Sequence, residues 1–514
     1  MRFRDADPVR RFNDRRPIPV PESSYGDRLS FYASSRPSKP QAMDLKISSG
    51  EGARDINAWD DVPASSWFTP RLGYREISPD ELVKGPAEFG PPQLPLVLMK
   101  FRLIENRARL LVSDRRGLLY MIKMDPPDFP AISTTAAVIV NRLFWGVGYN
   151  VAENHVLFFR REDLRIDPSR GLNEAAIDTV LGPRVRKQDE LHRAVAVRIL
   201  DGLPLGPTPE NGVRRDDPND LFPHQDRRTL RALRVFSALV NLCDISADNT
   251  LDLYEMTGDR GCIMHYLIDF DAALGSHAAR GNRSWAGFNH LFSFSEVLNN
   301  ALTLGLKVQD WERIRAVQWK SVGLFESEQF RAEKWKETHP FAPIRNSQPA
   351  DDYWAAKIVN ALTSAHIEAL VRAAQYPEPG AGAYVAATLM ERRRKIVDHF
   401  YSCVTPLEVL ACGNTELLLR DLGSGTEGGN GSEIPYRVRM CSDRGRKVQP
   451  ESTIHTTASG TLRIPITEKA LRTGDDYVVV LIESLGCSEN RREPAQFHLR
   501  RNERGELKVV GVKH

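Results

Sequence analysis

Two neighbouring segments, NLCDISADNTLD at residues 241–252 and HYLIDFDAALG at residues 265–275, organise the rest of this chain. In the first segment Asp244 and Asn249 stand five residues apart, and in the second Asp269 follows a short apolar run. A carboxylate, an amide oxygen shortly after it and a second carboxylate at the end of a buried strand can orient a hydroxyl nucleophile and hold Mg²⁺ against a nucleotide phosphate. The pattern therefore indicates a class of reaction, and it does not name the substrate.

The composition is that of a soluble globular chain with room for about two to four domains. The 514 residues are 41% hydrophobic and 27% charged, with a formal net charge of +3. Because acidic residues are interleaved with the arginines, no overall field favours an anionic membrane, and we expect no nucleic-acid partner. No stretch approaches the roughly 18 apolar residues that a transmembrane helix needs.

The start of the chain and its cysteines bear on the compartment. The opening MRFRDADPVRRFNDRRP lacks the apolar core of a signal peptide, which predicts a cytoplasmic protein, although an exported form without its leader would look the same. The cysteines show neither a C-x-x-C pair nor a zinc-like spacing with histidine, so we expect mostly buried free thiols. In an exported protein a disulfide is the alternative, with Cys403 and Cys412 the nearest pair. The six cysteines are Cys243, Cys262, Cys403, Cys412, Cys441 and Cys487.

Residues 1–95 are rich in Pro, Arg, Asp and Ser and show little periodicity, which predicts an extended N-terminal arm. Within this arm, INAWDDVPASSWFTPR at residues 56–71 carries two Trp and one Phe. We expect this aromatic segment to be buried against the core of its own chain. Ser78 is placed to cap a short helix at its N-terminus.

Residues 96–207 are predicted to form strands around one helix. Between the third and fourth strands, a 3.6-residue period predicts a helix from a cap at Ser133 to about Trp145. Lys123 lies in the third strand among apolar neighbours, where a lysine usually extends to solvent. Apolar runs bounded by turn residues predict the strands at 96–104, 109–114, 118–125, 156–159 and 194–200.

Residues 208–405 are predicted to be mostly helical, including residues 277–400. Amphipathic periods predict helices at 224–242, 351–374 and 383–400. Four arginines of the first helix are expected on a solvated or ion-paired face, and the basic run 392–395 on a solvated one. The four are Arg227, Arg228, Arg231 and Arg234.

Residues 406–514 differ in composition from the helical part before them. A Gly-rich loop at 423–433 interrupts short apolar runs that alternate with Gly, Asp and Asn turns, which predicts an all-β, sandwich-like domain. Such a domain could bind a carbohydrate or a protein partner, and capping the core is its simplest role. The runs lie at 416–422, 434–442, 461–467, 476–484, 495–501 and 507–514.

Four short motifs in residues 96–276 resemble the protein-kinase-like superfamily, nearest in pattern to HipA-type kinases, and more closely a family of uncharacterised bacterial proteins. The aromatic segment and the C-terminal helices share the likeness to that bacterial family, so it spans most of the chain. It implies an α+β fold with a two-lobed core, whose small lobe is 96–207 and whose large lobe is 208–405. The motifs are DPP at 125–127, GYNVAEN at 148–154, Asp244 with NTLD at 249–252, and HYLIDF at 265–270.

The resemblance also implies a role for each candidate site residue, carried over by position. Lys123 would contact the phosphates of ATP, and Asp244 would orient or deprotonate the acceptor hydroxyl. Asn249 and Asp269 would bind Mg²⁺. These residue types suit the chemistry because phosphoryl transfer depends mainly on positioning and on neutralising charge.

Three departures from the kinase pattern are visible in the sequence. Ala137 stands at the helix position where HipA-type kinases carry a glutamate that pairs with the lysine, and no clear glycine-rich loop lies between residues 96 and 117. Asp271 stands where glycine usually follows Asp-Phe. We expect its carboxylate to cap a turn or face solvent, with an extra metal ligand as the alternative.

Two functions are consistent with these observations. The first is ATP- and Mg²⁺-dependent transfer of phosphate to a hydroxyl of a protein or a small molecule. The second is a catalytically weak pseudokinase that acts as a nucleotide-binding or scaffold protein, which Ala137 favours. If the first holds, Lys123 and Asp269 face one cleft, with Asp244 and Asn249 on the same side and within about 10 Å.

Overall fold

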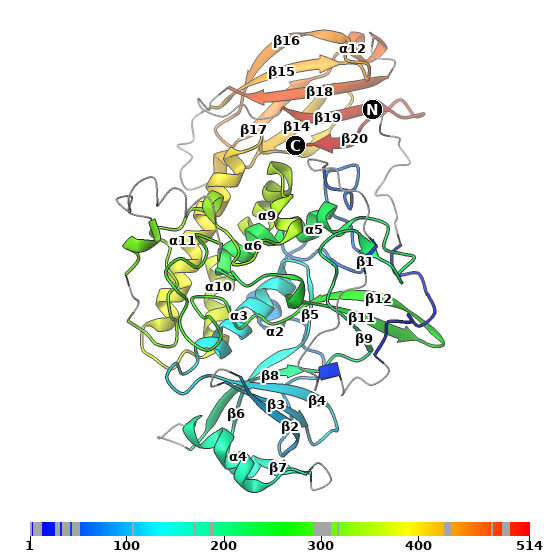
Figure 1. Cartoon of the computed structure of the whole chain (residues 1–514). Coiled ribbons are helices and arrows are strands. Elements are labelled where there is room, and N and C mark those ends of the chain that lie inside the picture. The colour runs from blue at the N-terminus through cyan, green and yellow to red at the C-terminus, as the bar shows by residue number, and fades with distance from the viewer. Residues whose placement is uncertain are drawn as a thin grey trace, which may run out of the picture.

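The structure is a computed structural model, and it describes residues 3, 13–25, 31–32, 42–43, 52–104, 107–167, 171–184, 190–290, 310–315, 318–425, 433–473, 476–485 and 494–514. Its architecture is mixed α+β, with several sheets and a β-rich C-terminal region (Figure 1). No helix within these ranges is long and apolar enough to cross a membrane.

A six-stranded sheet lies at the end of the molecule opposite the C-terminal region (Figure 1), with the order β6-β8-β4-β3-β2-β7. The strands predicted in this part of the chain are confirmed, with ends shifted by a few residues. In β4, Tyr120, Ile122 and Met124 are buried on one face, so Lys123 lies on the other face. The strands are β2 (Leu96–Ile104), β3 (Arg107–Ser113), β4 (Leu119–Met124), β6 (Asn154–Phe159), β7 (Leu164–Ile166) and β8 (His192–Arg198), and α4 (Glu174–Leu181) follows β7.

Helix α3 (Ile132–Gly146) is buried along almost its whole length between this sheet and the helical part of the molecule. The prediction that Ser133 caps it is wrong, because the N-cap is Ala131, whose side chain makes no capping hydrogen bond. Instead the Asp125 carboxylate accepts hydrogen bonds from the backbone N–H groups of Ser133 (2.8 Å) and Thr134 (3.0 Å). The first residue of the DPP motif thus ties the end of β4 to the start of α3.

A second sheet, ordered β5-β12-β11-β9, carries the two segments that organise the sequence. Strand β11 begins directly after Asn249, and β12 ends two residues before Asp269. Thr250 pairs with Leu267 in the antiparallel register, so the two segments are held side by side. The strands are β5 (Asn150–Val151), β9 (Leu203–Gly206), β11 (Thr250–Thr257) and β12 (Arg260–Leu267), and a separate two-stranded pair joins β1 (Ala42–Met43) to β10 (Val213–Arg214).

Helices form the middle of the molecule (Figure 1), but fewer residues are helical than the sequence predicts. The segment 224–242 is a 3₁₀ turn followed by two helices, and 351–374 is divided into α9 and α10. The described residues of 277–341 form turns and short 3₁₀ segments, so the prediction of helix there is wrong. Glycines with positive φ at 275, 287 and 323 explain this, since a left-handed residue ends a helix. The helices are α2 (Pro79–Lys84), α5 (Arg228–Arg231), α6 (Leu233–Val240), α8 (Ala342–Arg345), α9 (Pro349–Asn360), α10 (Ser364–Ala374) and α11 (Ala381–Ser402).

Two predictions of solvated basic faces are corrected by the structure. Arg227, Arg228 and Arg231 are buried and paired with aspartates, so only the ion-paired alternative holds for them. Arg392 is buried as well, and it donates hydrogen bonds to the Ala238 carbonyl (2.6 Å) and to other backbone oxygens. Periodicity places these arginines on the polar side of a helix, but it cannot show that a distant segment covers that side.

The N-terminal arm is largely irregular where it is described, and its aromatic segment packs into the core. Trp67 and Phe68 are buried, whereas Trp59 is 44% exposed and departs from the expectation. Phe68 fits against the core because Gly148 has no side chain there; a Cβ at Gly148 would approach the ring to 2.0 Å. Ser78 caps α2 as predicted, accepting a hydrogen bond from the Glu81 N–H.

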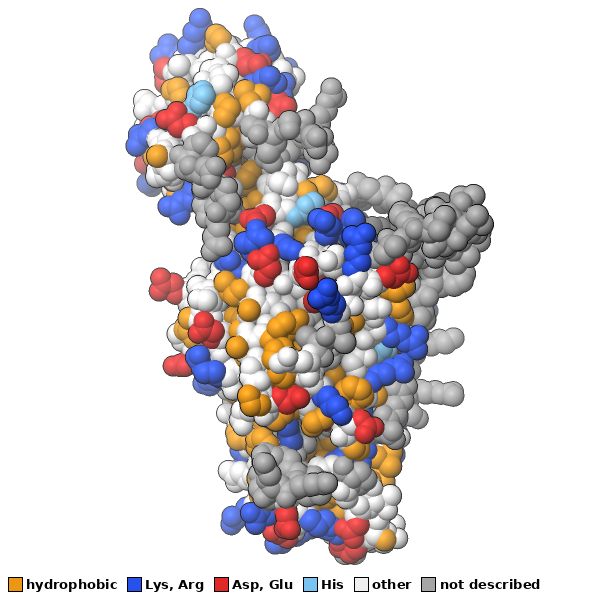
Figure 2. Space-filling view, turned by 90° about the vertical axis from the view of Figure 1, so that its left-hand side faces the viewer, with side chains coloured by type: hydrophobic (Ala, Val, Ile, Leu, Met, Phe, Trp, Pro, Cys, Tyr) orange, Lys and Arg blue, Asp and Glu red, His pale blue; other side chains and the backbone are white. Residues whose placement is uncertain are grey.

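In the described residues of the C-terminal region, the regular structure is β apart from one short helix and a 3₁₀ segment at Gly423–Gly425, and two antiparallel sheets enclose a shared apolar core. The predicted strands are confirmed, and two further strands, β13 and β16, accompany them. Figure 2 shows this region joined to the remainder by a narrower waist, with acidic and basic side chains interspersed over the face drawn. One sheet has β13 (Leu407–Cys412), β14 (Glu416–Asp421) and β17 (Thr461–Pro465); the other has β15 (Pro435–Cys441), β16 (Lys447–His455), β18 (Tyr477–Ser484), β19 (Ala495–Arg501) and β20 (Leu507–Lys513); the helix is α12 (Glu468–Thr473).

The cysteines agree with the prediction of free thiols where they are described. Cys243, Cys262, Cys403, Cys412 and Cys441 are all free, and Cys243 is buried. Cys487 lies outside the described residues. The other four described cysteines are only partly buried, so the expectation of burial holds for one of the five.

Candidate functional site

A cavity of about 350 Å³ lies between the six-stranded sheet and the second sheet. Its apolar wall combines Met121 and Val197 from the first sheet with Leu251 and Leu267 from the second. The segment that leads from β8 to β9 closes one side through Ile199 and its neighbour. An apolar pocket of this size with a few polar groups at one end is typical of a small-molecule site.

Lys123 and Asp269 meet at the polar end of this cavity. The ammonium of Lys123 forms an ion pair with the Asp269 carboxylate and lies 3.5 Å from Oδ2 of Asp271. Arg109, which is opposite Lys123 in the β3–β4 register, lies 3.5 Å from Asp269. The structure therefore brings together two residues that are 146 positions apart, on the cavity that both of them line.

The electrostatics of Asp269 are dominated by these cations. Burial alone would raise the pKa of its carboxyl, but Lys123 and Arg109 more than offset this and hold the pKa well below its usual range. The side chain is nevertheless 34% exposed. Asp269 is thus an ionised carboxylate at ordinary pH that still reaches the open cavity.

Local backbone geometry sets the direction of Asp269. Its φ of 62° is left-handed, a conformation that Asp adopts more readily than most residues. The Asn249 side-chain N–H donates to the Asp269 carbonyl at 3.4 Å, and the Ile268 N–H donates to the Asn249 carbonyl at 2.8 Å. These contacts place Asn249 against the turn that follows β12, on the same side as Asp269.

Asp244 lies apart from this cavity and lines a second pocket of about 200 Å³. Its side chain is exposed, yet enough protein surrounds the carboxylate to remove part of its hydration, which raises its pKa, while His277 opposes the shift. One short segment links the two pockets, because Asp269 and Phe270 line the first and Ala272 lines the second.

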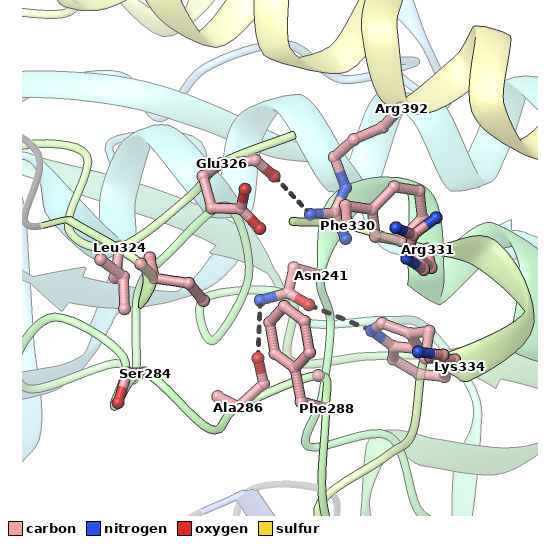
Figure 3. A pocket seen from close by; sticks show the side chains of 13 residues that line it. Asn241, Ser284, Ala286, Phe288, Leu324, Glu326, Phe330, Arg331, Lys334 and Arg392 are labelled. Atoms are coloured by element: carbon pink, nitrogen blue, oxygen red, sulfur yellow. Dashed lines mark hydrogen bonds between the residues drawn. The ribbon is translucent and has the colours of Figure 1, made fainter. Parts of the chain in front are cut away.

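A small pocket lined by Asn241, three residues before Asp244, shows how this loop is held (Figure 3). Asn241 ends α6 with a left-handed φ of 53°, and its side-chain oxygen accepts a hydrogen bond from the Trp335 indole at 3.0 Å. Its amide group also donates to the Ala286 carbonyl at 3.5 Å. Because both partners are buried, the chain leaves α6 in one direction and presents Asp244 to the second pocket.

The structure shows the surroundings of Asp271 and Ala137, two of the three departures from the kinase pattern. Asp271 is buried, and it is paired with Arg107 at 2.9 Å and with Lys123, so the expectation of a capping or solvent-facing carboxylate is wrong. Ala137 of α3 lines the same cavity as Lys123. Where a glutamate would pair with Lys123, the cavity wall is a methyl group, and the ammonium pairs instead with Asp269 and Asp271 of the turn that follows β12.

The donor set offers a limited fit for Mg²⁺. Within the described ranges, no group of three or more His, Cys, Asp or Glu side chains forms a ready metal site. Mg²⁺ commonly takes one or two protein carboxylates and completes its shell with water and phosphate oxygens, which Asp269 suits. The Asn249 side-chain oxygen already accepts hydrogen bonds from the backbone N–H and the hydroxyl of Ser246, both at 3.1 Å, and would have to exchange them.

Several site residues were not identified from the sequence. Arg107 and Arg109 pair with Asp271 and Asp269, and the signal was present, since they alternate along a strand next to Lys123. Phe31 and Tyr32 of the arm also line the cavity, and nothing local in their sequence indicates it. Glu153 of the GYNVAEN motif accepts hydrogen bonds from the backbone N–H groups of residues 88–90, which fixes the chain beside the sheet.

No protein-family model matches this chain, and no curated protein matches it either.

Proposed function

We propose that this chain is an atypical kinase-like protein that transfers a phosphoryl group from ATP, with Mg²⁺, to a hydroxyl of a protein or a small molecule. In this proposal residues 96–207, with the six-stranded sheet, form the small lobe of a kinase-like core, and residues 208–405, with β11, β12 and the helical part, form the large lobe. The observation that carries the proposal is the meeting of Lys123 with Asp269 in one cavity between two sheets. Asn249 adjoins the same turn.

In this proposal the cavity that holds Lys123 and Asp269 binds the nucleotide, and the pocket that holds Asp244 binds the acceptor. Met121, Val197 and Leu251 provide apolar contact for a base, and Lys123 with Arg109 provides positive charge for phosphates. Asp269 and Asn249 would hold Mg²⁺, which when bound neutralises charge on the phosphates. Lys123 pairs with Asp269 in this structure. A phosphate that enters the cavity would therefore replace Asp269 as the anionic partner of the lysine.

Asp244 faces the acceptor in this scheme. The acceptor oxygen forms a bond to the γ-phosphorus while the bond from that phosphorus to the β–γ bridging oxygen breaks, and the electron pair leaves with ADP. The hydroxyl proton passes to the Asp244 carboxylate, whose raised pKa favours accepting it.

A pseudokinase or scaffold is the second candidate, and specific contacts favour it. Ala137 leaves Lys123 without a partner from α3, both acidic residues of the turn are engaged by cations, and the Asn249 oxygen is occupied. Such a cluster could bind a nucleotide without positioning it for transfer.

The test measures nucleotide binding and transfer separately. A thermal shift with ATP in the presence and absence of Mg²⁺ is followed by transfer of labelled phosphate in the wild type, Asp269→Ala and Asp244→Ala. We expect Asp269→Ala to abolish the Mg²⁺-dependent shift, and Asp244→Ala to keep the shift and lose transfer. Asp259→Ala, an exposed acid in the β11–β12 turn, serves as the control. A wild type with a shift but no transfer supports the second candidate, and a wild type that ATP does not shift, with or without Mg²⁺, contradicts nucleotide binding.

A further inference from the structure

The second pocket, which holds Asp244, is surrounded by basic side chains. Two arginines and two histidines line it, all exposed, and they come from two loops that are far apart in sequence. Among the residues that line it, Asp244 is the single acidic group. The four basic residues are His277, Arg280, Arg283 and His339.

Backbone contacts place these side chains around one opening. The Ser276–Gly281 bridge and the hydrogen bond from the His277 N–H to the Arg280 carbonyl (2.8 Å) make a tight loop that presents both residues. The Thr338 N–H donates to the Cys243 carbonyl at 2.7 Å, so the segment with His339 is fastened beside Asp244. The basic rim is therefore built from loops anchored to the chain that carries the acid.

The dimensions and walls of the pocket restrict what it can hold. Its volume of about 200 Å³ is below the roughly 300–1,000 Å³ of pockets that enclose drug-sized ligands. Buried Cys243 and Ala272 contribute to its lining, and Trp285 adds an aromatic wall. A compact ligand of a few carbons with one charged group matches this space, and an extended chain would leave most of itself outside.

We propose that this pocket is the acceptor site and that the acceptor is a compact alcohol carrying a phosphate or carboxylate group, which Arg280 and Arg283 bind. The proposal rests on the proposed function, because it takes Asp244 to act on the acceptor hydroxyl. Guanidinium groups recognise the planar or tetrahedral oxygens of such anions through paired hydrogen bonds. With the anion held at the rim, the hydroxyl end of a short molecule can reach Asp244, which lines the same pocket as the two arginines.

The experiment uses glycerol 3-phosphate as the anionic probe and glycerol as the neutral one, on the full chain. Binding is measured by calorimetry for the wild type, Arg280→Ala/Arg283→Ala, and Arg260→Ala, an exposed arginine on β12 remote from the pocket. We expect glycerol 3-phosphate to bind the wild type and Arg260→Ala alike, and the double variant at least about tenfold more weakly. Glycerol should not bind measurably. Because Arg280 and Arg283 are exposed, a melting curve should show the double variant folded.

The outcomes separate this inference from the proposed function. Equal binding of glycerol 3-phosphate by the wild type and the double variant, or no binding to either, overturns the anionic acceptor. Phosphorylation of an acidic serine peptide that needs both arginines, without binding of glycerol 3-phosphate, overturns the compact acceptor in favour of a protein. If ATP with Mg²⁺ gives no thermal shift while glycerol 3-phosphate binds through the two arginines, the kinase proposal fails and the anion pocket stands.

Discussion

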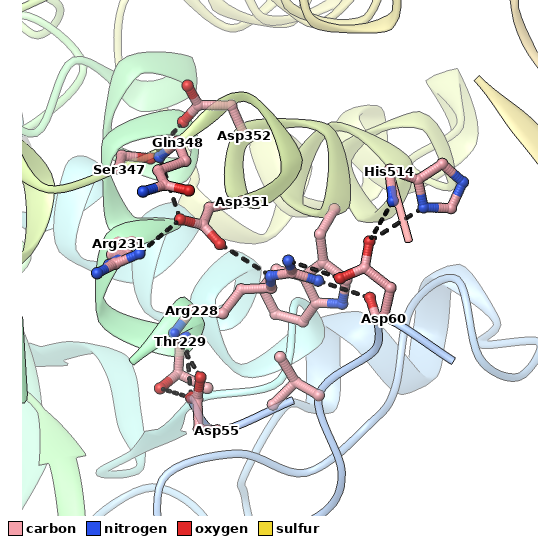
Figure 4. A network of polar contacts seen from close by, with 12 residues as sticks. Asp55, Asp60, Arg228, Thr229, Arg231, Ser347, Gln348, Asp351, Asp352 and His514 are labelled. Carbon is pink, nitrogen blue, oxygen red and sulfur yellow. Dashed lines mark hydrogen bonds and ion pairs between the residues drawn. The ribbon is translucent and has the colours of Figure 1, made fainter. Parts of the chain in front are cut away.

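Two clusters of basic and acidic side chains in this molecule use the same residue types in different settings. At the cavity, Lys123 and Arg109 meet Asp269, and these side chains remain between 14% and 34% exposed. In the helical part, Arg228 joins Asp60 (2.8 Å) and Asp351 (2.9 Å), and all three are buried (Figure 4). The first cluster borders open space, and the second is enclosed by protein on every side that the structure describes.

The difference in setting implies a difference in role. The buried cluster joins four parts of the chain, since Asp60 comes from the arm, Arg228 from α5, Asp351 from α9 and His514 from the end of the C-terminal region (Figure 4). Removing one partner there would leave another charge buried, with neither an ionic partner nor water around it, which destabilises the fold. The cavity cluster can exchange partners with solvent or with a ligand, so its charges are available for binding. Exposure and the presence of an adjoining cavity therefore distinguish a binding cluster from a structural one.

The largest expected effect is on the buried cluster. Arg228→Ala should lower the free energy of unfolding by about 3–5 kcal/mol, because Asp60 and Asp351 would lose a shared buried cation. Urea unfolding measures this directly. Arg394→Ala on α11 is the control, since its pairs with Glu391 and Asp398 are half-exposed and should contribute at most about 1 kcal/mol. Equal effects of the two substitutions would remove the distinction between the clusters.

The buried cluster should also give a defined acid transition. Burial would raise the pKa of Asp60, but Arg228 and His514 outweigh it and hold the pKa at about 2, against a usual value of 3.8. A depressed carboxyl pKa stabilises the fold fully above the unfolded value and loses that contribution as pH falls through the folded value. Unfolding free energy should therefore fall by about 2–3 kcal/mol between roughly pH 4 and pH 2 on account of this group.

Asp60→Asn isolates that contribution from the other acids of the protein. The variant should be less stable than the wild type at pH 7 and should approach it near pH 2, measured by urea unfolding across the range. A difference between the two proteins that does not change with pH would show that Arg228 and His514 do not set the ionisation of Asp60.

A smaller effect is expected at the cavity from restoring the missing acid of α3. Ala137→Glu should tighten ATP binding by about 1–3 kcal/mol if Lys123 is poorly anchored only because that partner is absent. Isothermal titration with ATP and Mg²⁺ measures the change. Ala137→Gln, of equal size and without charge, should not reproduce it. Loss of stability without tighter binding would mean that α3 packs differently from the kinase helix to which Ala137 was compared.

The smallest effect on stability should come from the cavity lysine. Lys123→Met should change the free energy of unfolding by less than about 1 kcal/mol, because Met keeps the apolar packing of the lysine stem, Arg109 remains beside the Asp269 carboxylate, and that carboxylate, 34% exposed, can regain water. The same variant should lose ATP binding, and Lys447→Met, an exposed lysine on β16, should change neither property. A destabilisation comparable to that of Arg228→Ala would assign the cavity cluster a structural role.

Local sequence accounts for much of the fold and for part of the site. Apolar runs bounded by turn residues predict the strands of both β-rich regions, because strand propensity and turn chemistry depend on residues that are close in the sequence. The Ser78 cap was predictable for the same reason, since its hydrogen bond spans three residues. Asp244, Asn249 and Asp269 were picked out from two short segments, and the pairing of β11 with β12 holds Asn249 beside the Asp269 turn.

Tertiary structure alone decided which charges are buried and which border a cavity. The partners of Arg228 lie 123 and 168 positions away in the sequence, and Asp269 lies 146 positions from Lys123. A periodic pattern within one segment therefore cannot predict these pairs. For the same reason, local sequence does not show that other segments cover the helical face of Arg392. Nor does it show that Asp271 pairs with Arg107 of the six-stranded sheet. The sequence by itself determined which segments could form strands, turns and an acidic site, because those depend on neighbours along the chain. Whether a charge is desolvated, paired or open to a ligand depends on neighbours in space, and only the packed fold supplies them.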